Sequence, residues 1–84
     1  MDIRDIRTRL LELLTAIAPD IDAAQLNPQR AFRDQFDFDS MDALHFATAV
    51  SEAFGIDIPE RDYASLASLE SAAQFVLSHL PAGA

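Results

Sequence analysis

The chain has no cysteine among its 84 residues. It therefore has no disulfide bond, no thiolate metal ligand and no cysteine nucleophile, and any thiol chemistry would need an added cofactor. Long apolar runs are missing too. No stretch approaches the roughly 20 apolar residues that span a bilayer, and residues 1–5 lack the apolar region of a signal peptide. We therefore expect a cytoplasmic protein that does not insert into membranes.

Basic residues are scarce: six lysine and arginine residues face 14 aspartate and glutamate residues, for a net charge of -8. This charge repels a phosphate backbone, so nucleic acid is a poor partner and basic protein surfaces are better ones. Half of the residues are apolar, which favours a folded domain over a disordered tail. We predict one monomeric domain over residues 1–84, ordered from about residue 2 to about residue 80, with an economical core because a chain this small buries only roughly 60–65% of its unfolded surface.

Apolar residues three and four positions apart predict three long helices. The first covers residues 2–18, where Asp2 is suited to be the N-cap and Pro19 prevents the helix from continuing. Its predicted apolar face consists of Ile3, Ile6, Leu10, Leu13, Leu14 and Ile17.

The second predicted helix begins at Asp39 or Ser40 and ends near Phe54, where Gly55 is suited to a C-terminal cap. One side of this helix should face the core and the other should face solvent. The predicted inner side holds Leu44, Phe46, Ala47, Val50 and Phe54, and the predicted outer side holds Ala43, His45, Thr48, Ser51 and Ala53.

The third long helix is predicted to begin after Ser68 as its N-cap, and Pro81 and Gly83 should leave a frayed tail behind it. Residues 56–59 before it read as an extended connector, and a short helical turn follows as far as Ala64. The side chains expected to point inward here are Tyr63, Leu66, Leu69, Ala72, Ala73, Val76 and Leu80.

Residues 19–39 interrupt the helical pattern with prolines and aspartates, which predicts a long loop with a short turn of helix after Pro28. A loop of this length is unusual in a compact domain and hints at function. The predicted fold class is therefore all-α: a four-helix bundle of three longer helices and one short one, with a long loop between the first two long helices.

Ser40 stands between Asp39 and Met41 at the predicted start of the second long helix, with Asp42 close behind. Backbone N–H groups at a helix N-terminus are unpaired and create positive potential, so a phosphate attached to the Ser40 hydroxyl would be favoured there. Asp-Ser pairs also serve simply as helix caps. This motif alone does not distinguish a phosphate attachment site from a simple helix cap.

Two histidines and a group of acidic residues offer no catalytic or metal site. His45 follows Ser40 by about a turn and a half and could contact a partner, whereas His79 near the end of the last helix is expected to be solvated. Neither is placed to form a triad with Ser40, so no enzyme is predicted. A calcium loop counted from Asp37 would need glycine where the chain has Asp42, so no metal is predicted.

Several linked features resemble the acyl carrier protein family over nearly the whole chain. The family's attachment motif, Asp-Ser followed by Leu or Met, matches residues 39–41, and Phe54 stands about 14 residues later, where the family also has Phe. The stretch from Gly55 to Glu60, with its Ile58-Pro59 pair, looks like the family's connector. The turn from Leu66 to Leu69 and the closing amphipathic helix are similar as well.

The resemblance implies a four-helix bundle in which a phosphopantetheinyl transferase uses coenzyme A to attach 4'-phosphopantetheine to Ser40. The thiol of this arm would carry an acyl group as a thioester between loading and transferring enzymes. Asp39 would be read by the transferase, and Met41, Asp42 and His45 would contact partners. Family members can shelter a lipid between helices, but core packing is the expected role of Phe32, Phe36, Phe46, Phe54, Tyr63 and Phe75.

The sequence also departs from familiar fatty-acid carriers, which have Leu-Gly before the motif and many glutamates in the second helix. Here Phe36-Asp37 replaces Leu-Gly, and Asp39, Asp42 and Glu52 are the helix's charges. We therefore expect a specialised lipid or secondary-metabolite carrier with less electrostatic contacts. A stand-alone aminoacyl or peptidyl carrier loaded by an adenylating enzyme is an alternative. A helical interaction domain with Ser40 only as an N-cap is another.

Overall fold

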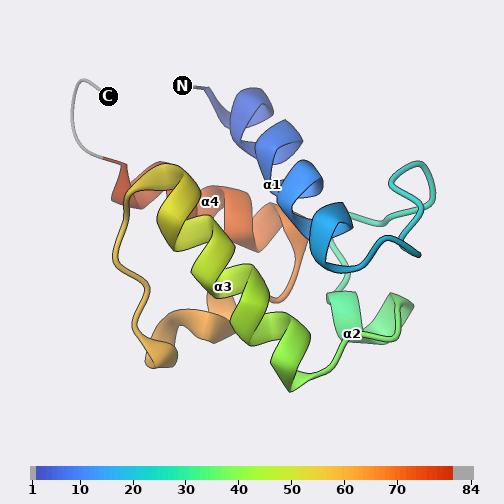
Figure 1. Ribbon diagram of the computed structural model, residues 1–84. Coiled ribbons are helices and arrows are strands. Elements are labelled where there is room, and N and C mark those ends of the chain that lie inside the picture. The colour runs from blue at the N-terminus through green and yellow to red at the C-terminus, as the bar shows by residue number, and fades with distance from the viewer. Residues whose placement is uncertain (1, 81–84) are drawn as a thin grey trace.

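The computed structural model describes residues 2–80, so the predicted frayed tail at Pro81 and Gly83 lies outside the described residues. This part of the chain contains helices and no strand (Figure 1). The all-α prediction is therefore confirmed, including the short turn of helix within the long loop. The elements are α1 (Ile3–Ile17), α2 (Phe32–Gln35), α3 (Ser40–Phe54), the 3₁₀ helix η1 (Glu60–Leu66) and α4 (Leu69–His79).

The predicted helix boundaries follow from caps that the structure confirms. The Asp2 carboxylate accepts a hydrogen bond from the Asp5 N–H at 3.0 Å, and α1 ends at Ile17, two residues before Pro19. Ser68 caps α4 and accepts from the N–H of its third residue. Between residues 2 and 80, no helix combines the length and hydrophobicity that crossing a membrane requires.

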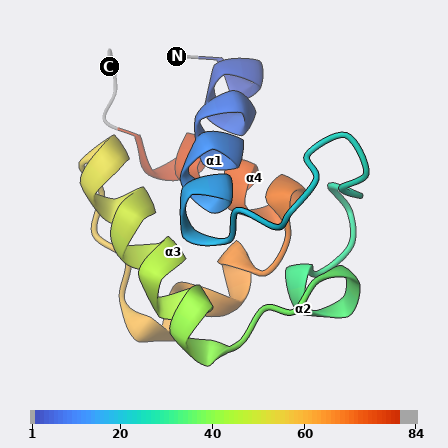
Figure 2. The same cartoon turned by 45° about the vertical axis from the view of Figure 1, so that its right-hand side comes forward.

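The core lies where α1, α3 and α4 meet, and α1 packs against both other helices (Figure 2). The η1 helix covers the neighbouring side and contacts α3 and α4. Ala47 of α3 and Ala72 and Ala73 of α4 are buried among larger side chains, and such small residues let helix backbones approach closely. The buried side chains of the three long helices are Ile6, Leu10, Leu14, Phe46, Ala47, Val50, Leu69, Ala72, Ala73, Phe75 and Val76.

The predicted inner side of α3 is wrong at Leu44, whose exposed fraction is 41%. The buried face of α3 is centred on Phe46, Ala47 and Val50, and this rotation leaves Leu44 at its edge. Ser51 also differs from its predicted outward position. It is half-buried, and its hydroxyl donates to the Ile56 carbonyl at 2.6 Å, which fastens the end of α3 to the extended connector.

Aromatic side chains pack much as predicted. Phe32 is fully buried, and its ring meets Phe46 edge to face at 5.6 Å between centroids and Phe38 at 5.4 Å. Such tilted pairs contribute roughly 0.5–1.5 kcal/mol beyond burial alone. Phe75 is also buried, whereas four of the aromatics are only partly buried against the core: Phe36, Phe38, Phe54 and Tyr63.

A charged pair joins α1 to α4. Arg7 donates through Nε and Nη2 to the two carboxylate oxygens of Glu70, at 2.9 Å each. These hydrogen bonds raise the pKa of Arg7, and they are the main cause that lowers the pKa of Glu70, with a second hydrogen bond from Gln74 adding to the effect. The two-point geometry fixes the relative orientation of the helices better than a single contact would.

The long loop is fastened to the start of α4 by two backbone hydrogen bonds. The Pro28 carbonyl accepts from the Glu70 N–H at 2.9 Å, and the Phe32 N–H donates to the Ala67 carbonyl at 2.8 Å. The first of these satisfies an N–H that the helix itself leaves unpaired. As a result, α2 is held beside the junction of η1 and α4.

The side-chain amide of Gln35 holds the same loop from within. It accepts from the Asn27 N–H at 2.9 Å and donates to the carbonyls of Asn27 and Arg30 at 2.9 and 2.8 Å. One exposed amide group thus satisfies three backbone groups that no helix or sheet pairs. The predicted long loop is therefore a segment held by hydrogen bonds, and it positions α2.

Candidate functional site

Ser40 is the first residue of α3, and its side chain is exposed. Asp39 is the N-cap: its Oδ1 accepts from the Asp42 N–H at 2.9 Å, while Asp42 Oδ2 accepts from the Asp39 N–H at 3.2 Å. This reciprocal capping box fixes where the helix begins. Of the two starts that the sequence allowed, the structure selects Asp39 as the cap and Ser40 as the first helical residue.

The first turn of α3 has backbone N–H groups that donate no hydrogen bond. Asp39 accepts hydrogen bonds from the Asp42 N–H through its carboxylate and from the Ala43 N–H through its carbonyl. The N–H groups of Ser40 and Met41 therefore stay available at the positive end of the helix dipole. A phosphodiester joined to the Ser40 oxygen would find donors beside it, so the local structure fits a phosphate-linked group.

The hydroxyl of Ser40 is also free to react. The hydroxyls of Ser51 and Ser78 donate to main-chain carbonyls, and Ser68 and Ser71 bind one another at the start of α4. In residues 2–80, the hydroxyls of Ser40 and Ser65 form no hydrogen bond, and Ser65 is half-buried. Ser40 thus combines an exposed position with an unoccupied hydroxyl.

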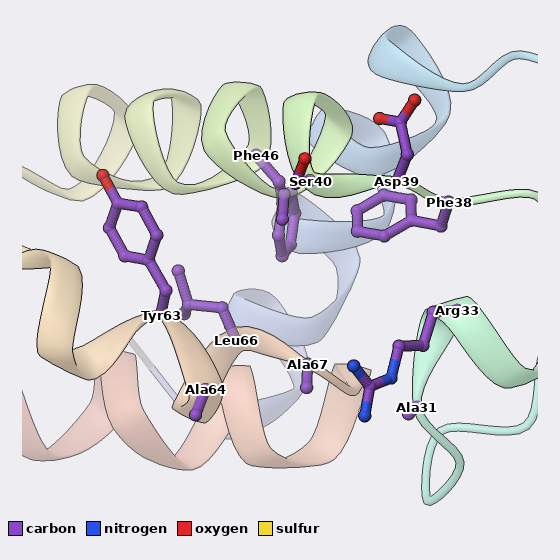
Figure 3. Close-up of a pocket in the computed structure, with 11 residues that line it drawn as sticks. Ala31, Arg33, Phe38, Asp39, Ser40, Phe46, Tyr63, Ala64, Leu66 and Ala67 are labelled. Atoms are coloured by element: carbon purple, nitrogen blue, oxygen red, sulfur yellow. The ribbon is translucent and has the colours of Figure 1, made fainter.

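A cavity of about 410 Å³ lies beside Ser40, between α3, η1 and the long loop (Figure 3). Ser40 and Asp39 stand at its rim, and its walls are mostly hydrocarbon. Figure 3 shows Arg33 extending from α2 toward the same space. The residues that line the cavity are Ala31, Arg33, Phe38, Asp39, Ser40, Ala43, Phe46, Tyr63, Ala64, Leu66 and Ala67.

Arg33 and Tyr63 were not singled out for this site from the sequence. Arg33 reads there as one of several exposed charges in a loop, and only the hydrogen bonds that hold α2 bring it to the cavity. Tyr63 was predicted to point inward, and it does so from η1. It also lines a second hollow at the surface, together with Ser40, Met41 and Leu44.

The residues predicted to contact partners lie around Ser40 on α3. Met41 is 56% exposed and His45 is exposed, whereas Asp42 is half-buried and its carboxylate serves the capping box. The structure therefore leaves Met41 and His45 free for contact. It also adds the exposed Leu44 beside them.

No triad or metal cluster is found in the part of the chain that the structure describes. Groups of three or more metal-ligating side chains are absent there. His79 is exposed as predicted, but its ring stacks on Phe75 at 4.0 Å, and its Nδ1 lies 2.8 Å from the Phe75 carbonyl oxygen. These contacts give His79 a structural role at the end of α4.

A comparison with protein families matches residues 6–76 to the family described as "Phosphopantetheine attachment site". The chain belongs to this family. The resemblance to acyl carrier proteins is thereby confirmed, and the family's cofactor is a covalently bound 4'-phosphopantetheine. The exposed hydroxyl and spare donors at the start of α3 fit such a group.

Individual relatives agree with this assignment. An acyl carrier protein of Rubrobacter xylanophilus is 29% identical over 79 residues, which cover 94% of this chain and 96% of that protein. An acyl carrier protein of Solidesulfovibrio magneticus is 32% identical over 56 residues, or 67% of this chain and 72% of its own length. Among solved structures, the A1-type ACP domain from module 5 of MLSA1 has the same fold, with a TM-score of 0.73 and 18% identity over 96% of this chain and 84% of that chain.

Proposed function

We propose that this chain is an acyl carrier protein whose 4'-phosphopantetheine is attached to Ser40. The observation that carries the proposal is the exposed, unbonded hydroxyl of Ser40 at the N-terminus of α3, inside the segment that matches the family. In the modification, the Ser40 oxygen forms a bond to the phosphorus of the phosphopantetheine in coenzyme A. Its proton passes to the transferase, and adenosine 3',5'-bisphosphate leaves.

The chain presents the arm and leaves catalysis to its partners. The capping box of Asp39 and Asp42 holds the start of α3, so that the Ser40 oxygen projects from a fixed position. The N–H groups of Ser40 and Met41 stabilise the charge of the phosphodiester. The bound phosphopantetheine supplies the thiol that carries the cargo as a thioester.

The outer surface of α3 supports a specialised set of partners. Met41 and Leu44 expose large apolar side chains close to Ser40 in the chain, and His45 on the same helix is exposed as well. We infer that partner enzymes bind this surface mainly through apolar contact, with Asp39 as the charged residue that the transferase reads. The affinity of such a complex should fall only weakly with added salt.

Intact-mass measurement after incubation with coenzyme A and a promiscuous phosphopantetheinyl transferase tests the attachment. We expect the mass increment of one phosphopantetheine on the native chain and none on Ser40→Ala. Ser65→Ala is the matched control because it removes the other unbonded serine hydroxyl of residues 2–80 and should leave the increment intact. An unmodified native chain, as expected of an interaction domain with Ser40 as a mere cap, or an increment on Ser40→Ala, would refute the proposal.

The cargo class is tested on protein isolated from its native host. The mass of the attached group separates an acyl cargo from an aminoacyl or peptidyl one. Cytoplasmic localisation, the monomeric state and the extent of the domain over residues 1–84 stay predictions from the sequence.

A further inference from the structure

The cavity beside Ser40 contains one cationic side chain, that of Arg33. Its remaining wall consists of Phe38, Phe46, Tyr63, Leu66 and alanines, apart from Ser40 and Asp39 at the rim. Arg33 is an exposed residue, and in Figure 3 its side chain extends from α2 toward the space bounded by these residues, while the carboxylate of Asp39 points away from it. A positive charge thus lies at one end of an otherwise hydrocarbon-lined space.

Within residues 2–80, no carboxylate forms an ion pair with Arg33. The ion pairs found in residues 2–80 are Arg7 with Glu70 and Arg9 with Glu12, and no hydrogen bond is found there for the Arg33 guanidinium. An arginine side chain carries a delocalised positive charge. Its planar guanidinium is suited to bind a carboxylate through two hydrogen bonds.

We infer that the cargo of this carrier is a short acyl group that bears a free carboxylate, with its hydrocarbon part in the cavity and its carboxylate on Arg33. This inference rests on the proposed function, because it requires the arm on Ser40. The arm is a flexible chain attached at the rim, so its far end can turn back into the cavity.

The volume of the cavity and the charge of Arg33 both restrict which acyl groups fit. A volume of about 410 Å³ is near the lower end of the roughly 300–1,000 Å³ typical of small-molecule sites, which favours a short chain. An aminoacyl cargo would bring an ammonium group toward Arg33, and like charges repel. The phosphate of the arm is a weaker candidate for Arg33, because the Ser40 oxygen points away from it in Figure 3 and has backbone donors beside it.

The experiment compares two loaded forms that differ only in charge. A promiscuous transferase attaches arms that carry either a six-carbon dicarboxylic acid as its monothioester or the same chain with a terminal amide. The rate at which hydroxylamine cleaves each thioester reports how well the cargo is sheltered, and the NMR signal of the Arg33 Nε–H reports contact. We expect the carboxylate form to react about threefold to fivefold more slowly than the amide form, as one partly exposed ion pair would produce.

Two variants make the test specific. Arg33→Gln should abolish the rate difference, whereas Arg30→Gln, which removes an equal charge from the same loop outside the cavity, should preserve it. Equal rates in the native chain, or a difference that survives Arg33→Gln, would overturn the inference. So would an Arg33 signal that shifts with the empty arm and does not move again with the cargo.

Intact mass distinguishes this failure from failure of the proposed function. A chain that takes no arm on Ser40 refutes the carrier proposal, and the inference falls with it. A chain that is correctly loaded but indifferent to the charge of its cargo refutes the inference alone.

Discussion

The carboxylates of Asp39 and Asp42 each accept the other residue's backbone N–H, at 2.9 and 3.2 Å. Asp39 therefore has a structural task, the capping of α3, besides the recognition task proposed for its charge. Two substitutions separate these tasks, because asparagine caps a helix as well as aspartate does but carries no charge.

Asp39→Ala should lower the free energy of unfolding by about 1 kcal/mol because the cap is lost. Asp39→Asn should leave stability nearly unchanged but slow phosphopantetheine transfer to Ser40. Urea unfolding and the initial rate of the transferase measure the two effects. Transfer to Asp39→Asn at the native rate would show that the residue is only a cap.

The pair of Arg7 and Glu70 should make stability depend on acidic pH. The pKa of Glu70 is lowered in the fold, chiefly by hydrogen bonds from Arg7 and then from Gln74. Its contribution to stability is therefore complete above about pH 4.3, the ordinary value for glutamate, and is lost as pH falls through the lower folded value.

Glu70→Gln should lower the melting temperature at pH 7 and remove this part of its fall on acidification. Thermal unfolding between neutral and strongly acidic pH measures both. Glu12→Gln is the control. Glu12 pairs with Arg9 on the exposed surface of α1, so its substitution should lower the melting temperature less than Glu70→Gln does. Equal effects of the two substitutions would contradict the importance given to the pair that joins α1 and α4.

Gln35→Ala should loosen the long loop, because the Asn27 N–H and the Arg30 carbonyl lose their hydrogen-bond partner and the Asn27 carbonyl keeps only the Arg30 N–H. We expect a loss of about 1–2 kcal/mol in stability, since the freed groups can partly turn to water. Hydrogen exchange at the Phe32 N–H should speed up. Gln29→Ala in the same loop should have little effect, because Gln29 takes part through its backbone N–H alone.

Gly55→Ala tests the C-terminal cap of α3. Gly55 has φ of 65°, and a Cβ built there would meet no atom within 4 Å, so the cost is backbone strain alone. We expect a loss of about 1–2 kcal/mol in urea unfolding. Gly55→Asn should cost less, because asparagine tolerates this conformation better. Equal losses would point to a cause other than the backbone angle.

Features that depend on neighbouring residues were predictable from the sequence. Asp2, Asp39, Ser68 and Gly55 were each assigned to a helix end, and the structure places all four there. Caps act within one turn, so their physics is contained in a few consecutive residues. The start of α3, and with it the exposed position of Ser40, belongs to this class.

Features that depend on distant residues were not predictable. Arg7 and Glu70 are 63 positions apart, and no pattern among their sequence neighbours predicts this ion pair. Leu44 was placed in the core because its spacing fits an apolar face, but the packing of Phe46 turned that face away from it. Arg33 reaches the cavity only because the loop is tied to α4.

The bonds from Pro28 to Glu70 and from Phe32 to Ala67 also bear on the order in which the protein folds. They close segments of about 40 residues, and such closure costs entropy that local caps do not. We therefore expect α3 to form before the cavity wall, with protection of the Phe32 amide appearing late in refolding. A growing chain would then expose its serine before the shelter for its cargo exists, and attachment of the arm need not wait for the finished fold.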